Sequence, residues 1–125
     1  MTHPTISYVE DDDFIREAVA QLLRAAGFEA ETFRTAEDFL QRGKPEQALC
    51  LVVDLKLPGM SGLELQEHLI ELGYRIPTIF VTSHSDERIR TAALKAGAIC
   101  FLNKPVGRDE FLSCVRMALG CTKTT

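Results

Sequence analysis

The sequence predicts an α/β fold in which a doubly wound, five-stranded parallel sheet is flanked by five helices. The first observation is the run LCLVV at residues 49–53. Five apolar residues without alternation are typical of a strand buried on both faces, as in a parallel sheet covered by helices. The second observation is the alternation of such strands with helical periodicities over residues 5–119. Because crossovers between parallel strands are right-handed, this alternation favours the strand order 2-1-3-4-5.

Length and charge define the class of protein further. The 125 residues are expected to form one domain, with a core at about 5–119 and a polar tail or linker start at 120–125. The net charge of -4 argues against a surface that binds nucleic-acid phosphates. No apolar run approaches the ~20 residues of a membrane span, and the first residues do not resemble a signal peptide. We therefore expect a cytoplasmic domain.

The four cysteines do not have the spacing of a metal or disulfide framework. Cys50 and Cys100 lie in predicted strands, and Cys114 lies on a predicted helix. We expect these three to be small buried hydrophobic residues in a reducing compartment.

The first strand is predicted at residues 5–9 and runs into four consecutive acidic residues. The helix that follows has an apolar stripe with the i, i+3, i+4, i+7 spacing, and Gly27 ends it. The stripe consists of Ile15, Ala18, Val19, Leu22 and Ala26. Residues 28–33 alternate between apolar and polar, which indicates a half-covered strand near an edge of the sheet.

A short helix is predicted at 35–41, where Thr35 and Asp38 resemble a capping box. The central strand, 49–54, ends at Asp54 and is followed by a turn cluster and a helix at 62–72. The remaining elements are strands at 77–82 and 98–102 and helices ending near residues 96 and 119.

Polar residues mark the carboxyl ends of four of these five strands. They are Glu10 and Asp11, Asp54, Thr82, and Lys104. In open parallel sheets, ligands bind at this edge, and here the first and third strands form the topological switch point. Each residue alone has a simpler explanation: Asp54 can start a turn, threonine is common in strands, and a strand-end lysine usually faces solvent. It is the combination that indicates a site.

Three carboxylates at one edge repel one another and need a cation. A ligand set of oxygens alone suits Mg²⁺, or Mn²⁺ in its place. A cation, an ammonium group (Lys104) and a hydroxyl group (Thr82) around one carboxylate are the groups that stabilise a transferring phosphoryl group. Asp54 would then be the nucleophile and form an aspartyl-phosphate.

The motifs Val9-Glu10-Asp11-Asp12, DLKLPGMSG at 54–62, Thr82-Ser83 and Lys104-Pro105 resemble the receiver domain of two-component response regulators. This resemblance covers residues 5–119 and implies the flavodoxin-like, CheY-like fold. It also implies that Asp54 accepts a phosphoryl group from a sensor histidine kinase or a phosphotransfer protein.

The resemblance assigns roles to single residues. Glu10, Asp11 and Asp54 correspond to metal ligands, and Lys56 to the residue whose backbone carbonyl joins them. Thr82 and Lys104 correspond to the phosphate-binding hydroxyl and lysine, and Pro105 to a proline preceded by a cis peptide bond. One departure is the Glu-Asp pair at 10–11 in place of Asp-Asp, which should preserve Mg²⁺ binding with a slightly longer reach.

Within this family, the loop at 82–86 and the run AGAICF at 96–101 are similar to the FixJ-like branch. Members of that branch usually carry a DNA-binding domain after the receiver. The resemblance therefore implies control of transcription through a domain that is not in this sequence, without direct nucleic-acid contact by the receiver. The alternative is a stand-alone receiver that acts in a phosphorelay or as a protein-binding module.

Phosphorylation adds roughly -1.5 to -2 charges at Asp54. We hypothesise that Thr82 then moves toward the phosphoryl oxygens and that Phe101 rotates inward; the alternative is that Phe101 is an ordinary core residue. The last two helices and the last strand carry mixed charges that suit a phosphorylation-favoured homodimer. Lys56 and His84, each two residues after a site residue, are candidates for controlling the phosphoryl lifetime, although solvated side chains are an equal alternative.

Three other functions fit the sequence less well. A haloacid-dehalogenase-like phosphatase needs a second aspartate two residues after the nucleophile, where this chain has Lys56. A flavodoxin-like FMN carrier needs a phosphate-binding loop after the first strand, where this chain has carboxylates. A degenerate receiver would lack part of the site. We therefore expect no enzyme activity beyond self-phosphorylation and autodephosphorylation on Asp54.

Overall fold

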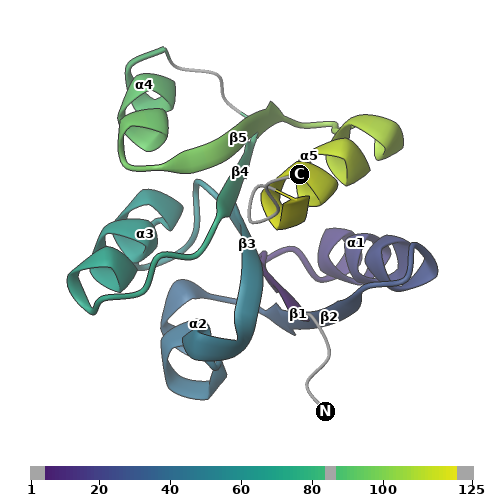
Figure 1. The fold of residues 1–125 in the computed structure, drawn as a ribbon, viewed down its shortest axis with the longest axis horizontal. Helices are drawn as coiled ribbons and strands as arrows, with labels where there is room; N and C mark the ends of the chain where they lie inside the picture. The colour runs from purple at the N-terminus through teal and green to yellow at the C-terminus, as the bar shows by residue number, and fades with distance from the viewer. Residues whose placement is uncertain (1–4, 84–86, 121–125) are drawn as a thin grey trace.

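The computed structural model describes residues 5–83 and 87–120, and its core is a five-stranded parallel sheet (Figure 1). The strand order is β2-β1-β3-β4-β5, as predicted. The strands are β1 (Thr5–Val9), β2 (Glu29–Phe33), β3 (Ala48–Asp54), β4 (Thr78–Thr82) and β5 (Ala98–Asn103). The helices are α1 (Asp13–Ala25), α2 (Ala36–Arg42), α3 (Gly62–Glu71), α4 (Glu87–Lys95) and α5 (Arg108–Gly120), with a short 3₁₀ turn at Pro45–Gln47.

The helices cover both faces of the sheet, which explains the unbroken apolar run in β3. Helices α1 and α5 lie on one face, and α2, α3 and α4 lie on the other (Figure 1). Cys50 and Val52 belong to the core under α1 and α5, whereas Leu51 and Val53 belong to the other core. All four are fully buried. Because successive residues of a strand point to opposite faces, each face of β3 supplies its own core.

Side-chain caps determine where the helices near the carboxyl edge of the sheet begin. Asp12 accepts a hydrogen bond from the Ile15 backbone N–H (2.9 Å), so α1 begins almost directly after β1. Ser61 and Glu64 form a complete capping box at the start of α3. These caps fix the lengths of the loops that follow β1 and β3.

Several local expectations differ from the structure. In α1, Ala20 and Leu23 are fully buried and Ala18 is exposed. The contact with the sheet is therefore centred on the 20/23 pair, with Val19, Leu22 and Ala26 partly buried beside it. Cys50 and Cys114 are buried as expected, but Cys100 is only half-buried because β5 is the edge strand.

Residues near the carboxyl ends of α3 and α4 also differ from one another in burial. The helix predicted at 62–72 ends one residue earlier, at Glu71, and Leu72 beyond it is 55% exposed. In α4, Ala93 is buried and Ala92 is exposed. Among the residues that the structure describes, every helix is too short or too polar to cross a membrane.

Candidate functional site

The predicted acidic cluster lies at the carboxyl edge of the sheet, between β1 and β3. Glu10 directly follows β1 and Asp54 is the last residue of β3, and these strands are paired so that Val9 is opposite Val53. Carboxylate oxygens of Glu10, Asp11 and Asp54 lie within 4.8 Å of one another. Glu10 and Asp54 are buried, whereas Asp11 is exposed. The strand pairing therefore brings together three carboxylates that are separate in the sequence.

These three residues fit a divalent cation such as Mg²⁺. Mg²⁺ takes oxygen ligands, uses one or two protein carboxylates and keeps several waters. Two buried carboxylates supply charge from inside the protein, and the exposed Asp11 leaves the outer side of the cluster open to water. The donor set contains no sulfur or nitrogen ligand that would favour a softer metal.

Lys104 follows the edge strand β5, and its side chain reaches the acidic cluster. Its ammonium nitrogen lies 2.7 Å from Asp54 Oδ2 and 2.9 Å from Glu10 Oε1. Burial alone would lower the pKa of Lys104, but the hydrogen bonds to Asp54 and Glu10 raise it overall, so the group stays charged. The backbone N–H of Lys104 donates to the Thr82 carbonyl (2.7 Å), which extends the β4–β5 pairing to this residue. The Lys104–Pro105 peptide bond is cis, the configuration that the resemblance implies.

Glu10 is the most enclosed member of the cluster, with a side chain only 1% exposed. Tyr8 donates its hydroxyl to Glu10 Oε1 (3.2 Å), and the Asp12 backbone N–H donates to Oε2 (3.1 Å). Burial raises the pKa of Glu10, and the hydrogen bond from Lys104 opposes this rise. Burial and the negative charge of Glu10 raise the pKa of Tyr8, so its hydroxyl keeps its proton and acts as a donor.

Sequence reasoning missed Tyr8 and Arg16 as supports of this site. Arg16 in the first turns of α1 donates to the backbone carbonyl of Glu10 (2.9 Å). A signal for Tyr8 was present, because residues two apart in an extended segment lie on the same side. Arg16 gave no such signal, since its contact depends on the path of the chain between β1 and α1.

The other predicted residues surround Asp54 to different degrees. Thr82 is fully buried at the end of β4, one residue beyond Val81, which pairs with Asp54. The Lys56 backbone N–H donates to Asp54 Oδ1 (3.1 Å), while its side chain is exposed. Phe101 is half-buried, with its ring centroid 6.4 Å from that of Phe80. His84 lies outside the described residues.

The loop between β3 and α3 is held close to Asp54 by two contacts. Glu37 of α2 accepts a hydrogen bond from the Met60 backbone N–H (2.9 Å), next to Gly59, which has a φ of +75°. Gly62 packs directly under the strand end: a Cβ there would lie 2.6 Å from the Asp54 carbonyl oxygen. The sequence placed Gly62 in a turn cluster but gave no signal for Glu37, which is 23 residues from Met60.

A family model and individual sequence relatives both match most of this chain. The family model described as "Response regulator receiver domain" matches residues 6–116. The response regulator protein TodT of Pseudomonas putida is 40% identical over 114 residues, which are 91% of this chain and 50% of TodT. The transcriptional regulatory protein FixJ of Rhizobium meliloti is 38% identical over 118 residues, 94% of this chain and 58% of FixJ. The chain therefore spans about half the length of the curated relatives that it matches.

Solved structures agree with the sequence relatives. The response regulator StyR is 46% identical with a TM-score of 0.90, and the match covers 96% of this chain and 61% of that one. The FixJ-N structure is 32% identical with a TM-score of 0.85, and the match covers 100% of this chain and 98% of that one.

Proposed function

Because the chain belongs to the family of response regulator receiver domains, we propose that Asp54 is its phosphoacceptor and that a histidine kinase or phosphotransfer protein is its phosphodonor. The observation that carries this proposal is the convergence of Glu10, Asp11, Asp54 and Lys104 at one edge of the sheet. A divalent cation bound by the three carboxylates would neutralise charge on the incoming phosphoryl group.

In the proposed transfer, a carboxylate oxygen of Asp54 attacks the phosphorus of a phosphohistidine. The phosphorus–nitrogen bond breaks, and the imidazole nitrogen keeps its electron pair. Lys104 already donates to Asp54 Oδ2, so its ammonium group needs only a short movement to contact a phosphoryl oxygen. The buried hydroxyl of Thr82, at the end of the neighbouring strand, is the second donor. Lys56 would supply its backbone carbonyl to the cation, because its backbone lies beside Asp54 while its side chain faces solvent.

The test is incubation with acetyl phosphate and Mg²⁺, followed by intact mass measurement. We expect an adduct of about 80 Da, as for an acyl phosphate on a carboxylate nucleophile. The adduct should be absent in Asp54→Asn and present in the control Asp38→Asn, which changes a carboxylate on α2 that pairs with Arg42. An adduct that persists in Asp54→Asn would contradict the proposal.

We also propose that phosphorylation is communicated to α4, β5 and α5 through Thr82 and Phe101. Thr82 ends β4 and pairs with Asn103 of β5, and Phe101 pairs with Phe80 two residues earlier, so a displacement of Thr82 acts on the strand that carries Phe101. The exposed residues of these elements carry charges of both signs, which suits a self-complementary C₂ contact.

Light scattering with a beryllium fluoride phosphoryl mimic and Mg²⁺ tests this dimer. The mass should double with the mimic and stay monomeric in Arg116→Glu, which reverses a charge on α5. Arg24→Glu, which reverses a charge on α1, outside the surface formed by α4, β5 and α5, is the matched control. An unchanged mass with the mimic would exclude a phosphorylation-favoured dimer.

Two finer proposals concern the lifetime and the output. Lys56 and His84 are proposed to shield the phosphoryl group from water, and Lys56→Ala should then shorten the lifetime of the adduct.

The output is proposed to be transcription through a further domain, because relatives such as FixJ are named as transcriptional regulatory proteins and are about twice as long. A stand-alone receiver in a phosphorelay is the second candidate. We also propose a cytoplasmic location, because Cys50, Cys100 and Cys114 form no disulfide among the residues that the structure describes.

A further inference from the structure

Tyr8 carries a hydroxyl group that core packing alone does not explain. Tyr8 belongs to β1, it is 2% exposed, and its ring lies in the core under α1 and α5. A phenylalanine ring would fill the same space. The hydroxyl group extends to the end of the strand and donates to Glu10 Oε1 (3.2 Å). Buried tyrosine hydroxyls usually have such a partner. The chemistry proposed for Asp54 assigns no role to this hydroxyl group.

The donors around Glu10 leave one acceptor position of its carboxylate open. A carboxylate has about four lone-pair positions, two on each oxygen. Oε1 accepts from Tyr8 and from the Lys104 ammonium group (2.9 Å), and Oε2 accepts from the Asp12 backbone N–H (3.1 Å). No other donor from residues 5–83 or 87–120 contacts this carboxylate. The second position on Oε2 is therefore the one available to an ion or to a water bound to it.

Tyr8 is the side-chain donor that can hold Glu10 in one orientation. A glutamate has one more rotatable bond than an aspartate, so the direction of its carboxylate depends more on its partners. Lys104 divides its ammonium group between Glu10 and Asp54, and the proposed transfer requires it to move toward a phosphoryl oxygen. The ring of Tyr8 is enclosed by the core and stays in place. Its hydroxyl group is also uncharged, so it does not repel a cation as an ammonium group does.

From these contacts we propose that Tyr8 is a positioning residue for the divalent cation. Its hydroxyl group holds Glu10 Oε1 toward the interior and leaves Oε2 to the ion or to a water on the ion. Without the hydroxyl group, the carboxylate can turn toward Lys104 and must be ordered again when the ion binds. Partners that orient metal-binding side chains typically change metal affinity by roughly 10- to 100-fold. This inference rests on the proposed binding of a cation by Glu10, Asp11 and Asp54, and Tyr8 lies outside that set.

The substitution Tyr8→Phe tests the inference, because it removes the hydroxyl group and keeps the ring that fills the core. The probe is Mn²⁺ alone. Electron paramagnetic resonance of the free ion gives its dissociation constant without any phosphodonor. We expect this dissociation constant to rise about tenfold in Tyr8→Phe. Circular dichroism at the same temperature verifies that the variant is folded, so that a weaker affinity is not a loss of the fold.

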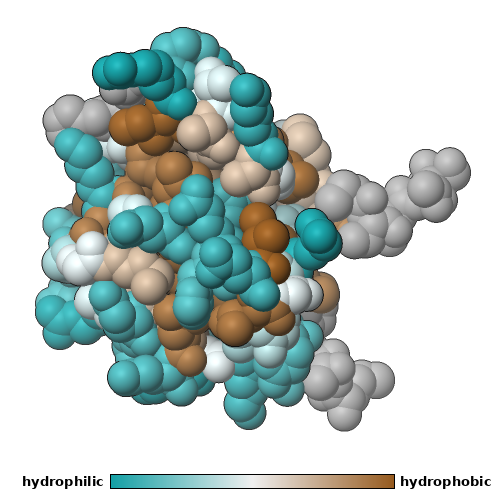
Figure 2. Space-filling model, turned by 90° about the vertical axis from the view of Figure 1, so that its left-hand side faces the viewer, coloured by the Kyte–Doolittle hydropathy of each residue, from teal (hydrophilic) through white to brown (hydrophobic). Residues whose placement is uncertain are grey.

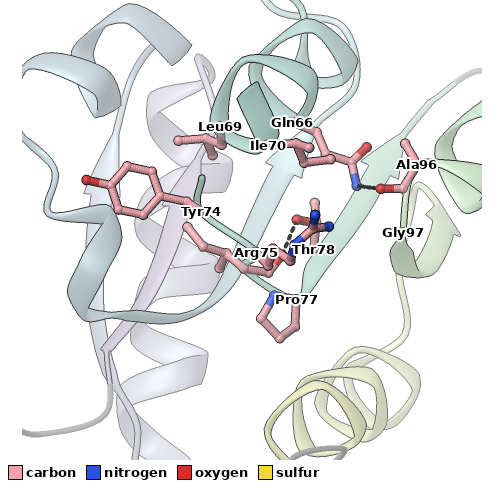
Figure 3. A pocket seen from close by; sticks show the side chains of 10 residues that line it. Gln66, Leu69, Ile70, Tyr74, Arg75, Pro77, Thr78, Ala96 and Gly97 are labelled. Atoms are coloured by element: carbon pink, nitrogen blue, oxygen red, sulfur yellow. Dashed lines mark hydrogen bonds between the residues drawn. The ribbon is translucent and has the colours of Figure 1, made fainter. Parts of the chain in front are cut away.

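The substitution Tyr74→Phe is the matched control, because it removes the hydroxyl group of the other tyrosine in the chain. Tyr74 packs against the core on the opposite face of the sheet from Tyr8. It follows α3, which lies on the side of the molecule shown in Figure 2, where hydrophilic side chains surround separate apolar patches. Figure 3 shows its ring pointing away from the other labelled side chains near the start of β4. This variant should bind Mn²⁺ with the affinity of the wild type.

The substitution Glu10→Asp tests whether Tyr8 acts through Glu10. The aspartate side chain is one methylene shorter and loses the contact with the Tyr8 hydroxyl group. Tyr8→Phe should therefore have no further effect on the Mn²⁺ dissociation constant in Glu10→Asp. The inference is overturned if Tyr8→Phe leaves the dissociation constant unchanged or lowers it, or if it raises the constant equally in both backgrounds. A wild type that binds no Mn²⁺ would overturn the proposed cation site as well, which distinguishes the two failures.

Discussion

Lys104 is the residue on which the electrostatic balance of the acidic edge depends. Its ammonium group pairs with both buried carboxylates of the cluster, Glu10 and Asp54. Removing one member of a buried charged group leaves the others unpaired, which is strongly destabilising. The same ammonium group also competes with a divalent cation for the oxygens that it contacts. A change at Lys104 should therefore alter both stability and metal affinity.

We expect Lys104→Met to lower the free energy of unfolding at pH 7 by about 2 kcal/mol in EDTA, a value below the fully buried case because Lys104 is partly exposed. Added Mg²⁺ should stabilise this variant more than the wild type, since a competing cation has been removed. Urea unfolding with and without Mg²⁺ measures both effects.

The stability loss in Lys104→Met should shrink as the pH falls. Burial raises the pKa of Glu10 in the folded protein, so the carboxyl group binds a proton there more readily than in the unfolded chain. Protonation therefore stabilises the folded variant and removes the unpaired charge. Lys95→Met on α4 is the control, and it should show neither the loss nor the dependence on pH. A variant as stable as the wild type in EDTA at every pH would show that the pairing contributes little.

Among the secondary-structure elements, the loop between β3 and α3 determines how closely the start of α3 packs against the backbone of Asp54. Gly62 is the first residue of α3, and its backbone N–H donates to the Leu55 carbonyl (3.0 Å). The close approach of Gly62 to the Asp54 carbonyl leaves no room for a side chain. This contact, rather than a positive φ, is what requires glycine at position 62.

Gly62→Ala should therefore destabilise the protein by about 2 kcal/mol, because the Cβ would push α3 away from the end of β3. The shift would also displace the loop that contains Lys56, so phosphorylation by acetyl phosphate should slow. Gly107→Ala is the matched control, because a Cβ there meets nothing within 4 Å. Thermal unfolding and intact mass measure the two effects. If both variants unfolded at the same temperature, the packing of Gly62 would have no energetic importance.

At the scale of the whole molecule, the sequence predicted the features that depend on strand order. Asp54 and Glu10 were located because buried apolar runs mark where strands end, and the strand order brings those ends together. The cores on both faces of β3 followed from the same pattern. Strand ends and strand order together determine which residues share an edge of the sheet.

Features that depend on loop paths or helix rotation could not be predicted in this way. The contact between Glu37 and Met60 joins α2 to the loop after β3, and no residue pattern in either segment predicts it. The hydrogen bond from Gln66 to the Ala96 carbonyl oxygen is visible only once the end of α4 is placed beside α3. The rotation of α1 that buries Ala20 and exposes Ala18 is set by how the helix packs on the sheet, because both residues are compatible with an amphipathic helix.

Binding of a divalent cation should stabilise the whole fold, because the three carboxylates come together only when β1 and β3 are paired. A ligand that binds only the folded state adds about 1.4 kcal/mol at ten times its dissociation constant. For a domain of this size, that corresponds to a rise in Tm of roughly 4 to 7 °C. Calorimetry in EDTA and in excess MgCl₂, at matched ionic strength, measures the difference. The rise should be largely lost in Asp11→Ala, which removes an exposed ligand at little structural cost, and retained in Asp13→Ala, which removes an exposed acid that pairs with Arg16. Equal values of Tm in EDTA and MgCl₂ would mean that the cluster does not hold the ion, and the proposed role of the cation in phosphorylation would then fail with it.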